Sequence, residues 1–174
     1  MAKIILMKRI TKLNILNLIL IIIGVVLIIL QLKINLIYID KIYFCFAVFL
    51  ILIGVSLFYK FMLFNSDSSL WLSINLIGVG INIFSLNALN LDYLKFGVTF
   101  LISPIIASLF VGHIFKDVLQ LKVVGYLIVM AITLYLFGFN IVKWYFSIII
   151  FIVGELFLAI MFKYLPKILK RNKG

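Results

Sequence analysis

Six long uncharged stretches, separated by charged residues, restrict the folds open to this sequence. They cover residues 13–32, 42–59, 68–91, 96–115, 123–142 and, interrupted only by Glu155, 144–162. Each is close to the roughly 20 residues that an α-helix needs to cross a hydrocarbon core about 30 Å thick. A β-barrel strand would alternate apolar and polar residues over about ten positions, whereas "LILIIIGVVLIIL" is apolar throughout. The pattern predicts six membrane-spanning helices.

The composition agrees with this prediction. The chain has 174 residues, 67% of them hydrophobic and 12% charged, and its mean hydropathy of +1.36 lies far outside the range of soluble domains. We therefore expect an all-α integral membrane protein, a six-helix bundle that forms a single polytopic domain over residues 1–174. The predicted spans are 13–31, 42–62, 69–90, 94–114, 119–139 and 143–163.

The basic residues predict an orientation in the membrane. If the N-terminus is cytoplasmic, twelve of the 16 lysines and arginines fall in cytoplasmic segments, and only Lys33, Lys41, Lys95 and Lys143 lie outside. This positive-inside bias predicts that both termini are cytoplasmic. It also accounts for the net charge of +11 without a nucleic-acid partner, since basic residues near a membrane attract anionic lipid head groups by about 1 kcal/mol each.

Glu155 is the sharpest single polar feature, because it stands near the middle of the last span in "FIVGELFLAI". An ionised acid at the centre of a spanning helix costs at least about 2.5–3.5 kcal/mol. The side chain must therefore be protonated, hydrogen-bonded or exposed to a water-filled cavity. With no lysine or arginine at this depth, we expect a neutral carboxyl group that faces other helices.

Other polar residues inside the spans form stripes at helical spacing. Asn75 and Asn82 lie on one seam of the third span, and Ser103 lies in the fourth. One interpretation is a polar cavity or path between helices. The other is interhelical hydrogen bonding, worth about 0.6 kcal/mol on average in a membrane bundle. Glu155, Asn75, Asn82 and Ser103 form the candidate intramembrane polar site.

Glycine and proline mark further positions within the spans. Gly24, Gly54, Gly78 and Gly154 occur near mid-span in similar short sequences, and small residues let helix backbones approach closely in a membrane. Pro104 interrupts the fourth span and predicts a kink there, either a static one or a hinge. These sequences share little beyond the glycine. Whether the first three spans and the last three spans form an inverted repeat is therefore left open.

Catalytic and metal-binding constellations are not evident in the sequence. Cys45 is the single cysteine, and His113 is the single histidine, expected at the cytoplasmic end of the fourth span beside Lys116. Ser103 is ten residues from His113 on one helix, about 15 Å along its axis, so the two cannot form a hydrogen bond. We expect no enzymatic activity, no metal and no cofactor.

Two classes of function remain for such a chain. One is a small permease or a substrate-binding membrane subunit. In size and span count the chain resembles the substrate-binding subunits of energy-coupling-factor importers, although "LNLILIIIGVVL" lacks the alanine-x-x-x-alanine pattern expected in the first span. The other class is a non-transporting protein that assembles with a membrane partner or with itself, or protects the membrane, as accessory and immunity proteins do. Either would reside in a prokaryotic plasma membrane as a multi-pass protein.

Overall fold

The computed structural model describes residues 2–34 and 40–171, and no strand occurs among them. Six helices in this part are long and apolar enough to cross a membrane, which confirms the predicted helical class. Backbone contacts divide the chain into two units, Met1–Leu91 and Asp92–Gly174. Each unit is described by itself.

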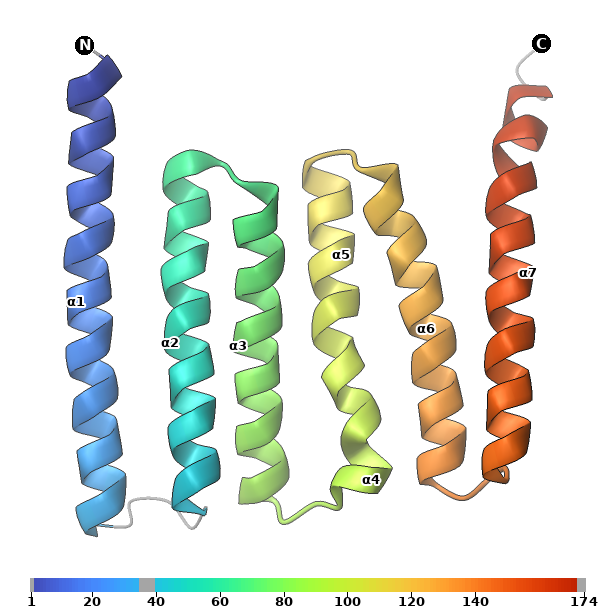
Figure 1. The fold of residues 1–174 in the computed structure, drawn as a ribbon, viewed down its shortest axis with the longest axis horizontal. Coiled ribbons are helices and arrows are strands. Elements are labelled where there is room, and N and C mark those ends of the chain that lie inside the picture. The colour runs from blue at the N-terminus through green and yellow to red at the C-terminus, as the bar shows by residue number, and fades with distance from the viewer. Residues whose placement is uncertain (1, 35–39, 172–174) are drawn as a thin grey trace. The chain divides into compact units, whose positions relative to one another are not determined.

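The first unit contains three helices side by side (Figure 1). They are α1 (Ala2–Ile34), α2 (Lys41–Phe64) and α3 (Asp67–Ala88). α1 packs on α2, and α2 packs on α3. α1 begins well before the predicted boundary at residue 13, because no glycine or proline interrupts residues 2–12 and lysine and arginine are good helix formers.

Short polar residues set the helix ends of the first unit. The Asp40 carboxylate accepts a hydrogen bond from the Ile42 amide at 2.9 Å at the start of α2. α2 ends at Asn65, whose φ of 53° is the left-handed conformation common at helix C-termini and tolerated by asparagine. The Ser66 hydroxyl then caps α3 by accepting from the Ser69 amide at 3.4 Å. These caps allow α2 and α3 to be joined by a two-residue turn.

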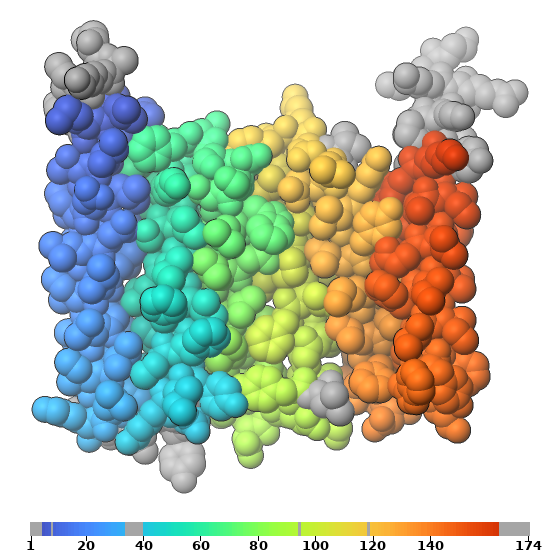
Figure 2. Space-filling view, in the orientation of Figure 1, coloured from blue at the N-terminus to red at the C-terminus, as the bar shows by residue number. Residues whose placement is uncertain are grey.

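The core of the first unit lies where the three helices meet. Phe44 and Val48 of α2 are buried, with Leu27, Leu52 and Phe84 packed against them. The atoms of α2 and α3 adjoin one another along the pair in the space-filling view (Figure 2). By contrast, α1 leaves many apolar side chains exposed.

The second unit is arranged around α6. Its helices are α4 (Tyr93–Phe96), the 3₁₀ helix η1 (Gly97–Leu101), α5 (Ile102–Ile114), α6 (Val118–Gly138) and α7 (Trp144–Arg171). The short helices α4 and η1 pack on α6 together with α5, and α7 also packs on α6.

Pro104 lies in the first turn of α5, directly after the change from 3₁₀ to α-helical geometry. In a first turn the missing N–H of proline costs little, because that amide has no intrahelical acceptor. The fourth span is therefore built from two helical segments that meet close to Pro104. Motion at this point, the predicted hinge, stays a prediction.

Candidate functional site

Glu155 is half-buried on α7, beside the face that packs against α6. The face of α7 that contacts α6 includes Ser147, which is buried, Gly154 and Phe162. The Phe162 ring lies close to Gly125 of α6. The residues on either side of this region, such as Val153 and Leu156, are exposed. Glu155 therefore borders the helix contact and does not point fully away from it.

The two helices approach closely next to Glu155. A Cβ atom placed on Gly154 would lie 2.6 Å from Cγ1 of Val129 on α6. Since adjacent helical residues are about 100° apart, the Glu155 side chain leaves the backbone at the edge of this contact. Gly154 and Glu155 are adjacent in the sequence, so the close helix contact and the carboxyl group lie at the same level along α7.

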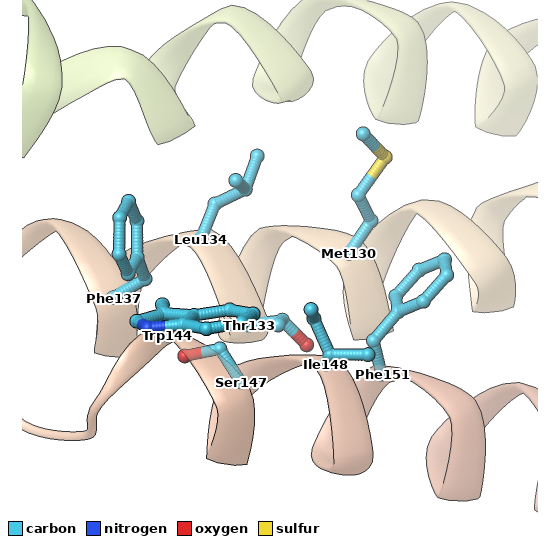
Figure 3. A pocket seen from close by; sticks show the side chains of 8 residues that line it. All are labelled: Met130, Thr133, Leu134, Phe137, Trp144, Ser147, Ile148 and Phe151. Carbon is cyan, nitrogen blue, oxygen red and sulfur yellow. The ribbon is translucent and has the colours of Figure 1, made fainter.

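A groove of about 330 Å³ runs along the α6–α7 pair (Figure 3). Its lining residues are Met130, Thr133, Leu134, Phe137, Trp144, Ser147, Ile148 and Phe151. Trp144, Ile148, Phe151 and Glu155 follow one another at spacings of four, three and four residues, so they share one side of α7. Glu155 consequently lies one turn beyond Phe151 along the side of the helix that lines this groove.

Two hydroxyl groups in the groove donate to backbone carbonyls four residues earlier in the chain. The Thr133 hydroxyl donates to the Val129 carbonyl at 2.9 Å, and the Ser147 hydroxyl donates to the Lys143 carbonyl at 3.5 Å. Figure 3 shows the two side chains on the facing helices, close to the Trp144 ring. With these hydroxyls engaged, the groove offers a mainly apolar surface.

The other candidate polar residues are distributed over both units. Ser103 is buried on α5, which packs on α6 just as α7 does. Asn75 and Asn82 are half-buried on α3 in the first unit, two turns apart on one side of the helix. The Asn75 amide donates to the Trp71 carbonyl of its own helix at 2.8 Å, and Asn82 also has a bonding partner. The gathering of these residues around Glu155 stays a prediction.

Glycines of α2 and α3 bring these two helices into close backbone contact. A Cβ on Gly54 would lie 2.9 Å from the Ser73 carbonyl oxygen, and a Cβ on Gly80 would lie 2.9 Å from the Ala47 carbonyl oxygen. Gly24 makes its near contact with the Leu52 side chain. Gly78 is half-buried, and the reciprocal partner of Gly54 in this helix pair is Gly80.

Gly80 is not among the glycines predicted to pack closely, although the sequence contains a signal for it. Both helices carry a small residue, then isoleucine four positions later, then glycine three positions after that: Ala47, Ile51 and Gly54 in α2, and Ser73, Ile77 and Gly80 in α3. Small residues seven positions apart lie on one helix face. Matching stripes on two successive spans therefore predict a close antiparallel pair.

The described residues contain no group of three histidine, cysteine, aspartate or glutamate side chains placed to hold a metal ion. No family model, curated protein or solved structure matches the chain. The residues and their geometry are therefore the basis for a functional proposal.

Proposed function

We propose that the chain is a non-enzymatic multi-pass protein of the plasma membrane that works as a small permease or a substrate-binding membrane subunit. The observation that carries this proposal is the position of Glu155, half-buried midway along α7 and next to the close α6–α7 contact at Gly154. A carboxyl group inside a membrane span costs free energy. Such a residue is expected where it binds a substrate, an ion or a proton.

The proposed orientation has both termini in the cytoplasm. The support is the concentration of lysine and arginine before the first apolar stretch, at Lys60 near the end of α2, around the turn between α5 and α6, and at the end of α7. Reporter fusions after Leu36 and after Ser66 test it. The proposal requires the first reporter to be outside and the second to be inside, and the reverse result would overturn it.

Flux measurements with Glu155→Gln test the role of the acid. The purified protein is reconstituted into liposomes that hold a pH-sensitive dye, and proton movement is followed while candidate solutes are added across an imposed gradient. Substrate-dependent flux is expected in the wild type and is expected to fall at least about tenfold in Glu155→Gln, because an amide cannot exchange a proton at this position.

Asp67→Asn is the matched control for this experiment. Asp67 is exposed in the first turn of α3, where its carboxylate accepts from the Ser68 amide at 2.7 Å, and asparagine retains that acceptor. Its flux should equal that of the wild type. Equal flux in Glu155→Gln and the wild type would contradict the proposed role of Glu155.

The alternative is a non-transporting protein that assembles with a membrane partner or a second copy of itself. The α6–α7 groove favours this alternative because its lining is mainly apolar and its walls include exposed Trp144 and Ile148. An apolar groove in a membrane helix pair suits another helix as well as a lipid chain. Wild-type liposomes without flux, combined with a defined oligomer in cross-linking, would favour assembly over transport.

A further inference from the structure

A second groove lies at the end of the second unit where α5 turns into α6. It has a volume of about 620 Å³, and its lining residues are Leu109, Phe110, Gly112, His113, Lys116 and Leu121. Half of these residues are large and apolar, and two carry nitrogen donors. The groove therefore has an apolar wall and a basic end.

The apolar wall is open to the surroundings of the helices. Leu109, Phe110 and Leu121 are 44%, 55% and 44% exposed. Gly112 lets the Leu121 side chain approach the backbone of α5, since a Cβ there would lie 2.9 Å from Cδ2 of Leu121. A hydrocarbon chain can lie along this surface and cover it.

The basic end is formed by the turn itself. His113 and Lys116 are both exposed, and Lys116 adopts a φ of 54° between the two helices. The neighbouring carboxylate, Asp117, is directed at the start of α6, where it accepts a hydrogen bond from the Leu119 amide at 2.8 Å. The lysine ammonium and an imidazole N–H remain as donors toward the groove.

We infer that this groove binds one anionic phospholipid. Its phosphate lies against Lys116 and His113, and one acyl chain covers Leu109, Phe110 and Leu121. Charge-assisted hydrogen bonds from lysine to phosphate are stronger than neutral ones, and basic pockets between membrane helices favour anionic head groups. The inference concerns a separate site and does not depend on transport through the Glu155 region.

Native mass spectrometry tests the inference directly. The protein is released from nanodiscs that contain equal amounts of phosphatidylglycerol and phosphatidylcholine, and the retained lipid is identified. The wild type is expected to keep one phosphatidylglycerol. Lys116→Asn, chosen because asparagine tolerates a positive φ, is expected to reduce this retention about fivefold, as the loss of one basic contact predicts.

Two control variants make the result specific. Lys116→Arg keeps the charge and should keep the lipid, whereas Lys60→Gln removes an exposed lysine from the other unit, outside this groove, and should change nothing. Equal retention of the two lipids by the wild type would overturn the inference, as would an equal loss in Lys60→Gln. Displacement of the bound lipid by inorganic phosphate would assign the basic end to a free anion and would also overturn it.

Discussion

The two units use glycine in different ways where their helices pack closely. In the first unit, Gly54 and Gly80 each face backbone atoms of the opposite helix, at 2.9 Å from a carbonyl oxygen for an added Cβ. In the second, Gly154 faces the side chain of Val129, and Gly125 faces the ring of Phe162. A side chain can change its rotamer, whereas a backbone moves only with its helix.

This difference predicts that the α2–α3 pair and the α6–α7 pair respond differently to a change in packing. We expect the α2–α3 pair to keep a fixed separation, because each glycine lies against peptide groups of the other helix. We expect the α6–α7 pair to adjust more easily, because valine and phenylalanine side chains fill the contact. Glu155 is next to this adjustable contact, which is where a proposed binding or transport step would need a change in packing.

The largest expected effect is that of Gly54→Ala. The new methyl group would lie 2.6 Å from Ile77 Cγ1 and 3.0 Å from the Ile77 amide nitrogen, so α2 and α3 must separate. Overpacking costs about 1–3 kcal/mol, and the better helix propensity of alanine offsets about 1 kcal/mol. We expect a net loss of about 1–2 kcal/mol in the free energy of unfolding, in the upper part of the remaining range because backbone atoms cannot move aside, measured by denaturant titration in micelles.

Gly97→Ala serves as the control for this experiment, because a Cβ on Gly97 meets no atom within 4 Å and its φ is not positive. Its stability should equal or slightly exceed that of the wild type. Shortening the neighbour in Gly54→Ala/Ile77→Ala should not restore stability, because the Ser73 oxygen and the Ile77 nitrogen remain in place. Full restoration would show that the α2–α3 contact is not fixed by the backbone.

Gly154→Ala should have a smaller effect, and a second substitution should reverse it. The added methyl group meets Val129 Cγ1 at 2.6 Å but no backbone atom at that distance. We expect a loss of about 0.5–1 kcal/mol, because overpacking is partly offset by helix propensity. Thermal unfolding should show recovery in Gly154→Ala/Val129→Ala, and a persistent loss would contradict the side-chain character of this contact.

Ser56→Ala tests the polar link between α1 and α2. The Ser56 hydroxyl donates to the Asn17 side-chain oxygen at 2.5 Å, and such bonds are worth about 0.6 kcal/mol on average in membrane bundles. A double-mutant cycle with Asn17→Ala should return a coupling of that size. The control Thr11→Ala removes a bond within one helix, from Thr11 to the Met7 carbonyl, and should show no coupling to Asn17.

Gly24→Ala should have the smallest effect of the series. Its added methyl group meets the Cδ1 end of the Leu52 side chain at 2.5 Å, and the next atom of that side chain is 4.0 Å away. Leucine can swing its terminal methyl group aside, so we expect a stability change within about 0.5 kcal/mol. A loss as large as that of Gly54→Ala would remove the distinction between backbone and side-chain contacts.

The helical class could be predicted because the length of an apolar stretch is set by the thickness of the membrane. The start of α1 could not, since charged Lys8, Arg9 and Lys12 end the apolar run and yet are good helix formers. The edge of a membrane span and the end of a helix have different physical causes. The first is decided by hydration of side chains, and the second by caps and helix breakers.

The candidate site could be predicted from the sequence less well than the helical class. Gly78 and Gly80 stand two residues apart and therefore on different sides of α3. The contact of Gly80 with Ala47 and Ile51 depends on the register between α2 and α3, which span order alone does not determine. Ser103 and Glu155 belong to helices that both pack on α6, whereas Asn75 and Asn82 belong to the first unit. Periodicity identifies the faces of helices but not which faces meet.

The most direct test of the central proposal, that Glu155 takes part in binding or transport and is therefore reached from water, uses cysteine labelling, which is practical because the chain has a single cysteine that can be replaced. In a Cys45→Ala background, the variants Glu155→Cys and Leu156→Cys are exposed to a membrane-impermeant methanethiosulfonate reagent in liposomes, and labelling is measured by mass. The thiolate is the reacting form and needs water, so we predict labelling at position 155 and none at position 156, which is exposed on the apolar surface of α7 and is expected to face lipid. Equal protection of both positions would contradict the proposal.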